Sequence, residues 1–146
     1  MKVSQLMSSN VVSVSPEDTA ITAARLFARN NIGALPVCMD DGKLRGIVTD
    51  RDIVTRCLAP ESDPETTKIR EIMTRGVISV TPEADIKEAA RIMSGEQIRR
   101  LPVTSDGKVV GMLSLGDMAR TQMFDMEASK ALSEISMPPQ KYGKNT

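Results

Sequence analysis

Hydrophobic positions along the chain follow a pattern that occurs twice and predicts alternating short helices and strands. Each copy opens with apolar residues three and four positions apart, at residues 3–7 and 69–73, which is typical of one helical turn. A run of β-branched residues then predicts a short strand, at residues 11–14 and 77–80. The same order of elements in both copies indicates an internal duplication.

A helix is predicted next in each copy, from a characteristic start. A hydroxyl residue, a proline and a glutamate stand together at residues 15–17 and again at residues 81–83. A hydroxyl N-cap, a proline at the first helical position and an acid in the first turn favour a helix that begins there. Its apolar stripe comprises Ala20, Ala23, Ala24 and Phe27 in the first copy and Ile86, Ala89, Ala90 and Met93 in the second.

Two further strands are predicted to form a hairpin in each copy. The first of them covers residues 34–39 or residues 100–104. The Asp-Gly pairs at residues 41–42 and 106–107 are strong hairpin signals, and each leads into the next strand.

A second helix completes each copy and is predicted to start near Asp52 or Asp117. The helix after Asp117 is expected to continue to about Ile135, because prolines follow soon after it. Residues 140–146 have the composition of a disordered tail.

The duplication predicts an α/β (α+β) fold made of two β-α-β-β-α repeats. Neither repeat is large enough to bury its own faces, so we expect the two to pack sheet to sheet with pseudo-twofold symmetry. The predicted organisation is repeat 1 at 1–59, a linker at 60–68, repeat 2 at 69–125, and a helix end with a flexible tail at 126–146.

The segment where the last strand of each repeat runs into its second helix carries the candidate chemistry. It reads Gly-x-x-Thr-x-x-Asp from Gly46 to Asp52 and Gly-x-x-Ser-x-x-Asp from Gly111 to Asp117. A helix N-terminus attracts phosphate, a hydroxyl can bond a phosphate oxygen, and a carboxylate can accept from the hydroxyls of a ribose. Helix capping is the alternative role for the hydroxyl and for the acid.

Composition removes several classes of function. Lys plus Arg and Asp plus Glu both number 19, and the chain has two Phe, one Tyr and no Trp, so a nucleic-acid binder is not expected. There is no His, and the only cysteines are Cys38 and Cys57, so neither an ordinary zinc site nor a His-based acid–base pair is expected. No signal peptide or membrane span is apparent, which predicts a cytoplasmic protein with reduced thiols.

The duplicated motifs together resemble a pair of cystathionine-β-synthase (CBS) domains, the Bateman module. The resemblance rests on the β-branched strand, the Pro-Glu helix start, the Leu-Pro-Val strand and the Gly-x-x-Thr/Ser-x-x-Asp turn, and it covers about residues 1 to 125. It implies a stand-alone regulatory module that binds AMP, ADP, ATP or another adenosyl compound in two clefts between the repeats.

The resemblance also implies which residues line each cleft, since the turn of one repeat is combined with strands of the other. Site A is expected to use Ile47, Thr49, Arg51, Asp52, Val77, Ile78, Thr81, Arg99, Arg100, Leu101 and Pro102. Site B is expected to use Met112, Ser114, Gly116, Asp117, Val11, Val12, Ser15, Gly33, Ala34, Leu35 and Pro36.

Several of these residues have an ordinary structural alternative. Ser15 and Thr81 can be helix caps only, and Val12 and Ile78 can be core residues. Arg99 and Arg100 replace Gly33 and Ala34 of the first repeat, and they are either a phosphate site or a solvated strand edge. The methionine-rich stretch at 118–126 is expected to pack, with a dimer contact as one option.

The resemblance therefore implies a non-enzymatic sensor that signals through a change of shape or association, as a homodimer, with no required cofactor and no metal. One alternative is a protein–protein interaction module whose clefts are degenerate. The other is a nucleotide-hydrolysing enzyme, for which the sequence supplies no His and no tight acidic cluster. The regulated partner protein is unknown.

Overall fold

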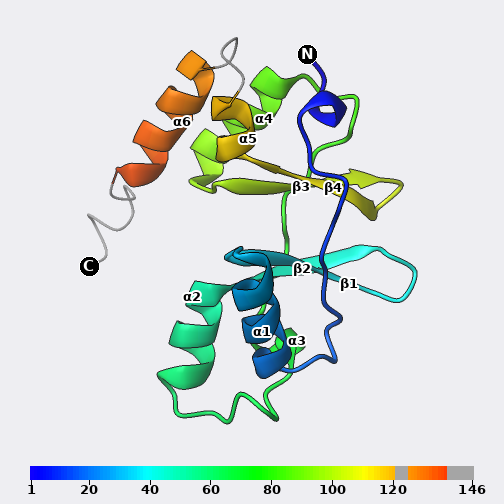
Figure 1. Cartoon of the computed structure of the whole chain (residues 1–146), viewed down its shortest axis with the longest axis vertical. Coiled ribbons are helices and arrows are strands. Elements are labelled where there is room, and N and C mark those ends of the chain that lie inside the picture. The colour runs from blue at the N-terminus through cyan, green and yellow to red at the C-terminus, as the bar shows by residue number, and fades with distance from the viewer. Residues whose placement is uncertain (121–124, 138–146) are drawn as a thin grey trace. The chain divides into compact units, whose positions relative to one another are not determined.

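The computed structural model describes residues 1–120 and 125–137 and divides them between two compact units (Figure 1). Unit 2 contains Asn10–Ile78 and the hairpin tip Thr104–Val110. Unit 1 contains Met1–Ser9, Ser79–Val103 and the chain from Gly111 onward. The boundaries of the compact units therefore differ from those of the sequence repeats.

The difference arises from the helical turn that opens each repeat, which we call its lead-in. Each lead-in packs in the unit built mainly by the other repeat. The lead-in of the first repeat is the 3-10 helix η1 (Val3–Gln5), and its Val3 N–H donates to the Ala84 carbonyl at 2.9 Å. The lead-in of the second is α3 (Ile69–Ile72), and its Ile69 N–H donates to the Asp18 carbonyl at 2.8 Å. These bonds occupy corresponding positions in the duplication, and the predicted helical turns are confirmed.

Unit 2 is a two-stranded antiparallel sheet with helices packed on one face (Figure 1). Its elements are α1 (Ala20–Asn30), β1 (Ala34–Cys38), β2 (Leu44–Thr49), α2 (Asp50–Ile53), the π-helix η2 (Val54–Leu58) and α3. The core contains Ala20, Ala23, Phe27, Leu35, Val37, Val48, Ile53, Cys57, Ile69 and Ile72, among others. The apolar stripe predicted for the first helix is thus confirmed.

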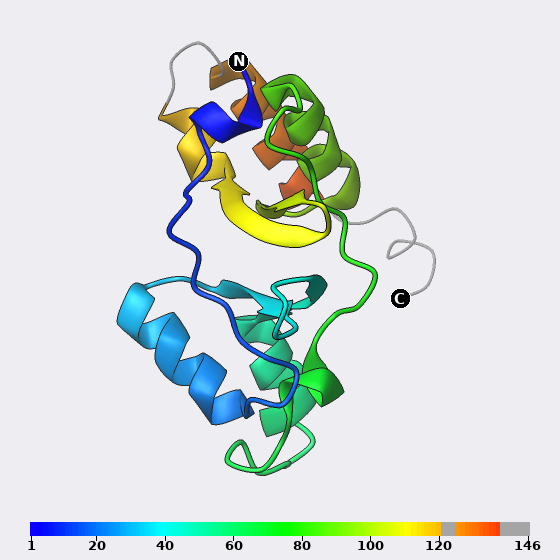
Figure 2. The ribbon, with the colours of Figure 1, turned by 90° about the vertical axis from the view of Figure 1, so that its right-hand side faces the viewer.

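Unit 1 repeats this arrangement and carries an additional helix. Its elements are α4 (Ile86–Glu96), β3 (Arg100–Ser105), β4 (Lys108–Ser114), α5 (Leu115–Ala119) and α6 (Asp125–Ser136). The helices lie on one face of the β3–β4 sheet (Figure 2). The stripe predicted for α4 is buried at all four positions: Ile86, Ala89, Ala90 and Met93.

The predicted first strands are wrong, because only one residue of each pairs with the sheet. Val14 donates its N–H to the Pro36 carbonyl at 3.1 Å and accepts from the Cys38 N–H at 2.8 Å. A longer parallel ladder would next require an N–H at residue 36, which proline lacks. Val80 in the other repeat likewise bonds the Pro102 carbonyl at 3.1 Å and forms an isolated bridge.

The predicted starts of the first helices are also wrong. These helices begin at Ala20 and Ile86, after the caps Thr19 and Asp85. Residues 15–18 form a turn instead, in which the Ser15 N–H donates to the Asp18 carboxylate at 2.8 Å. An acidic side chain three residues on can satisfy this N–H without a helix, so the Ser-Pro-Glu sequence does not compel one.

The second helices begin close to the predicted positions, at Asp50 and Leu115. The long helix expected after Asp117 is two elements, α5 and α6, and α6 ends at Ser136. Met118 is fully buried, whereas the rest of the 118–126 stretch lies almost wholly outside the described side chains, as does the predicted tail at 140–146.

Candidate functional site

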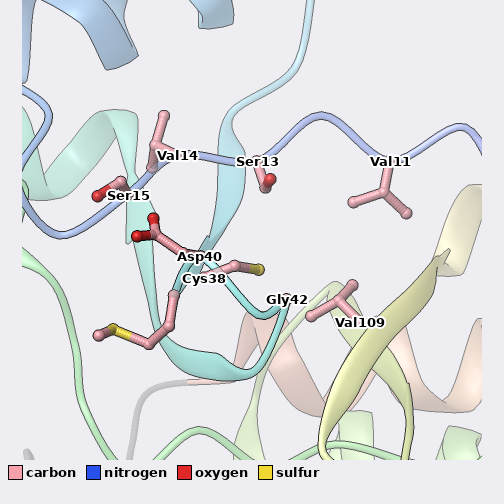
Figure 3. Close-up of a pocket in the computed structure, with 9 residues that line it drawn as sticks. Val11, Ser13, Val14, Ser15, Cys38, Asp40, Gly42 and Val109 are labelled. Atoms are coloured by element: carbon pink, nitrogen blue, oxygen red, sulfur yellow. The ribbon is translucent and has the colours of Figure 1, made fainter.

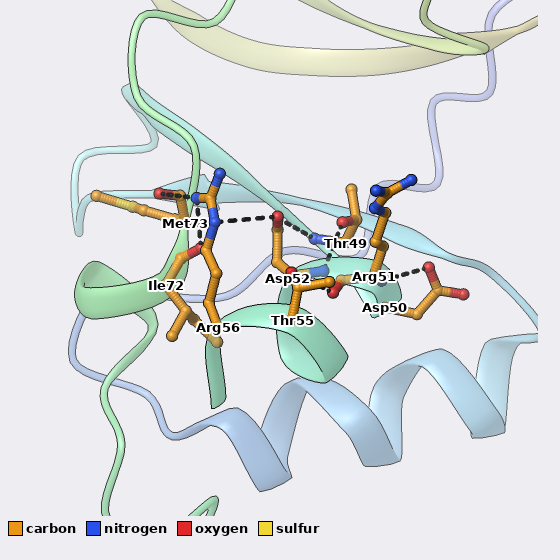
Figure 4. Close-up of polar contacts among 8 residues, drawn as sticks. All are labelled: Thr49, Asp50, Arg51, Asp52, Thr55, Arg56, Ile72 and Met73. Carbon is orange, nitrogen blue, oxygen red and sulfur yellow. Dashed lines mark hydrogen bonds and ion pairs between the residues drawn. The ribbon is translucent and has the colours of Figure 1, made fainter. Parts of the chain in front are cut away.

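Both Gly-x-x-Thr/Ser-x-x-Asp turns close with the same reciprocal pair of hydrogen bonds. In unit 2 the Asp52 N–H donates to Thr49 Oγ1 at 3.1 Å, and the Thr49 N–H donates to Asp52 Oδ2 at 2.9 Å (Figure 4). In unit 1 the corresponding bonds between Ser114 and Asp117 are both 3.0 Å. Each pair is a capping box that satisfies two N–H groups at a helix start. The capping role of these four residues is confirmed.

Capping uses only one carboxylate oxygen of each aspartate. Asp52 is 8% exposed, and its second oxygen lies 3.8 Å from Arg56 Nε. The Arg56 guanidinium also donates to the carbonyls of Ile72 and Met73, at 3.1 and 3.3 Å (Figure 4). In unit 1 the second oxygen of Asp117 pairs with Arg120. Among the residues that the structure describes, each aspartate therefore keeps one carboxylate oxygen free of backbone bonds, and its role toward a ribose stays a prediction.

Part of predicted site A lies together within unit 2. Ile47 exchanges two backbone hydrogen bonds with Thr74, at 2.8 and 3.0 Å, which holds the segment leading to Val77 and Ile78 beside β2. Ile78 is 39% exposed, so it is not a core residue. The members of site A in unit 2 are Ile47, Thr49, Arg51, Asp52, Val77 and Ile78, and those in unit 1 are Thr81, Arg99, Arg100, Leu101 and Pro102.

The members of predicted site B are also divided between the units. Leu35 is a fully buried core residue of unit 2, and Val12 packs against that core. Ser15 accepts a hydrogen bond from the Glu17 N–H at 3.2 Å within its turn and does not cap α1. Site B has Met112, Ser114, Gly116 and Asp117 in unit 1, and Val11, Val12, Ser15, Gly33, Ala34, Leu35 and Pro36 in unit 2.

The arginine pair replaces two small residues without changing the local backbone contact. The Arg99 carbonyl accepts from the Leu115 N–H at 3.0 Å, just as the Gly33 carbonyl accepts from the Asp50 N–H at 3.0 Å. Arg99 is exposed and Arg100 is half-buried, and within the described part of the chain neither guanidinium forms an ion pair. Both charges are available to an anion, and their binding role stays a prediction.

A cavity of about 420 Å³ in unit 2 includes two site B residues and a cysteine that the sequence did not single out (Figure 3). Burial raises the pKa of the Cys38 thiol, and a hydrogen bond with Ser13 offsets part of that rise in pKa. The sequence gives one indication that Cys38 is unusual, because the second repeat has Thr104 at the corresponding position. The lining residues are Val11, Ser13, Val14, Ser15, Cys38, Met39, Asp40, Gly42 and Val109.

Residues 1–120 and 125–137 contain no group of three or more His, Cys, Asp or Glu side chains placed to hold a metal ion. No helix in that part of the chain has the length and apolar character of a membrane span. Cys38 and Cys57 are both free thiols.

These observations define a tandem-repeat protein with a matched capped turn in each repeat, and comparisons identify its family. A family model described as the CBS domain matches twice, at residues 3–59 and 69–123. The CBS domain-containing protein YhcV of Bacillus subtilis (strain 168) is 39% identical over 134 residues, covering 92% of this chain and 94% of that protein. The chain belongs to the CBS-domain family and contains two CBS domains.

Two solved structures extend the comparison. The crystal structure of Hypoxic Response Protein I with two coordinated zinc ions matches with a TM-score of 0.77 and 37% identity, over 82% of this chain and 98% of that one. The CBS domain pair of protein MJ0100, in complex with 5′-methylthioadenosine and S-adenosyl-L-methionine, matches with a TM-score of 0.74 and 31% identity, over 82% and 94%. CBS pairs similar to this chain thus include one that binds adenosyl ligands.

Proposed function

We propose that this chain is a regulatory module that binds an adenine nucleotide or another adenosyl compound and does not turn it over. The observation that carries the proposal is the MJ0100 CBS pair, which is 31% identical and was solved with two adenosyl ligands. The capped turns add support, since each presents an aspartate with one carboxylate oxygen that has no backbone bond to any described residue.

In the proposed binding mode, Asp52 and Asp117 accept hydrogen bonds from ribose hydroxyls, and Thr49 and Ser114 face the phosphates. Arg99 and Arg100 give site A an affinity for phosphate that Gly33 and Ala34 cannot give site B. The ligand is AMP, ADP, ATP or a related adenosyl compound, and its occupancy changes the shape or association of the protein. We also propose that the protein acts in the cytoplasm as a homodimer, of about twice the 15.9 kDa chain mass, which light scattering would measure.

The proposal is tested by calorimetric titration with AMP, ADP, ATP, NAD and S-adenosylmethionine, together with a turnover assay. Asp52→Asn separates the two roles of Asp52, because its amide oxygen can still accept from the Thr49 N–H. The amide nitrogen then occupies the other position, and as a donor it cannot accept from a ribose hydroxyl.

We expect Asp52→Asn to weaken ligand binding by about 1.5 to 3 kcal/mol while leaving the ligand-free stability nearly unchanged. Asp52→Ala should weaken binding as much and also lower stability by about 1 kcal/mol, because the cap is lost. Asp117→Asn is the matched variant for site B. No binding to any of the five compounds would favour the interaction-module alternative, and product formation would favour the enzyme.

A further inference from the structure

A second cavity in unit 2 is rich in arginine and lies outside the predicted clefts apart from one shared residue, Ser15. Its volume is about 290 Å³. The turn at residues 15–17, the end of β1, the start of β2 and the α3 region supply its walls. The lining residues are Ser15, Pro16, Glu17, Met39, Asp40, Arg45, Arg70, Met73 and Arg75.

Backbone hydrogen bonds fix two walls of this cavity against each other. The Arg70 N–H donates to the Pro16 carbonyl at 3.0 Å, which joins α3 to the turn. Arg70 Nη1 contacts Glu17 Oε2 at 2.5 Å, and Arg75 Nη2 donates to the Arg70 carbonyl at 3.3 Å. Arg70 and Arg75 are thereby held on the same wall.

The positive charges of the cavity exceed the negative ones. Glu17 neutralises Arg70, whereas neither Arg45 nor Arg75 has a carboxylate partner among the residues the structure describes. Asp40 is the other acid in the lining. Guanidinium groups gathered around one cavity repel each other, and a bound anion would remove that repulsion.

The duplication shows that the fold does not need these arginines. Arg45 corresponds to Val110 of the other repeat, Arg70 to Ser4 and Arg75 to Ser9. The lead-in with Ser4 docks with the same backbone bond as α3, since the Ser4 N–H donates to the Pro82 carbonyl at 2.9 Å. The same backbone contact therefore forms without charge at these positions.

We propose that this cavity binds a phosphoryl group, either as free phosphate or as part of a small molecule. Guanidinium groups bind phosphate oxygens in pairs, and neither Arg45 nor Arg75 has a carboxylate partner in the described part of the chain that would compete with phosphate. Because the arginines are exposed, binding weakens as ionic strength rises. The site is independent of the adenosyl function, which rests on the capped turns and Arg99.

The test is an NMR titration of the arginine Nε–Hε resonances with inorganic phosphate and with pyrophosphate at fixed ionic strength. We expect saturable shifts at Arg45, Arg70 and Arg75 in the unmodified chain. In the variant Arg45→Val/Arg75→Ser, which copies the other repeat and keeps the Arg70–Glu17 pair, affinity should fall about tenfold or more.

Two control variants locate the site. Arg29→Gln/Arg91→Gln removes two exposed arginines outside the cavity and should leave the affinity unchanged. Arg99→Gly/Arg100→Ala should also preserve the shifts of the Arg45, Arg70 and Arg75 resonances. If AMP binds this variant at the cavity more tightly than phosphate does, the natural ligand carries its phosphoryl group on a larger molecule. Equal affinities would indicate free phosphate.

Three results would overturn the site: shifts that do not saturate, equal losses in the cavity variant and the Arg29/Arg91 control, or loss of binding only in the Arg99/Arg100 variant. The resonances of the unmodified chain report the location directly, so the outcome does not depend on the variant folding. Failure of the adenosyl proposal would leave these arginine shifts intact, which keeps the two proposals distinguishable.

Discussion

The two capped turns share their backbone contacts and differ in what surrounds them. The four reciprocal bonds of the capping boxes agree within about a tenth of an ångström between Thr49–Asp52 and Ser114–Asp117. Beyond the cap, Arg56 bridges Asp52 to two carbonyls at the end of α3, whereas Arg120 pairs with Asp117 on the same short helix.

This comparison indicates that the two repeats share the contacts that build the backbone and differ in their charged side chains. Arg99 and Arg100 occur only in the second repeat, and Arg45, Arg70 and Arg75 have uncharged counterparts at Val110, Ser4 and Ser9. A role required by the fold should appear at both positions of a pair. Charges found at one position only are therefore the better candidates for ligand recognition, and each can be tested by copying in the residue of the other repeat.

The largest effect is expected where the backbone itself is crowded, at Gly46. A methyl group there would lie 2.5 Å from the Thr74 carbonyl oxygen, which is bonded to the Ile47 N–H. Gly46→Ala should lower the free energy of unfolding by about 3 kcal/mol, because this carbonyl cannot move without breaking that bond. Urea unfolding measures the loss.

Gly111→Ala is the matched change in the other repeat. Its methyl group would lie 2.5 Å from Met7 Sδ, a flexible side-chain atom, and 3.0 Å from the Ser8 carbonyl. We expect a loss of only about 1 kcal/mol, most of it recovered when Met7→Ala is added. Equal losses for the two glycine variants would contradict the comparison.

The second effect concerns the charge difference between the proposed sites. Arg99→Gly/Arg100→Ala copies Gly33 and Ala34, and it should weaken ATP at site A about tenfold or more while adenosine is hardly affected. A two-site titration at low and moderate salt measures both, and the ATP preference should shrink as salt rises. Unchanged ATP binding would show that the pair is only a solvated strand edge.

The sequence predicted the duplicated elements well because periodicity and hairpin signals are local. The prediction failed at the first strands. A longer strand there would need a backbone N–H at residue 36, which is a proline more than 20 residues away in the chain. The sequence also could not reveal that α3 packs with the first repeat. The Arg70–Glu17 contact depends on that packing, so the sequence alone does not predict the arginine cavity.

The third effect distinguishes Arg56 from Arg120. Arg56→Gln removes hydrogen bonds to the Ile72 and Met73 carbonyls and should cost about 1 kcal/mol, even though the Arg56 side chain is 49% exposed. Arg120→Gln should cost less than about 0.5 kcal/mol, because the Arg120 side chain is 74% exposed and its ion pair is solvated.

Amide hydrogen exchange at Thr74 provides a local measurement of the same effect. The Thr74 N–H donates to the Ile47 carbonyl at 2.8 Å, immediately after the carbonyls that Arg56 holds. Its exchange should accelerate in Arg56→Gln and not in Arg120→Gln. If both variants leave Thr74 exchange unchanged, Arg56 does not stabilise the end of α3.

The smallest effect is expected at Cys38, which corresponds to Thr104 of the other repeat. Burial raises the pKa of the Cys38 thiol, so the folded chain holds this proton more tightly than the unfolded chain does. The resulting stability is fully present below the ordinary thiol pKa and is lost as pH rises through the raised pKa. Thermal unfolding from about pH 7 to about pH 10 should therefore show the unmodified chain losing stability relative to Cys38→Thr, which has no thiol to titrate. Ser13→Ala removes the hydrogen bond that lowers the Cys38 pKa, so the pKa of the folded chain should rise further, and the relative loss should become larger and extend to higher pH. Parallel pH profiles for the unmodified chain and Cys38→Thr would show that Cys38 titrates alike in the folded and unfolded chains.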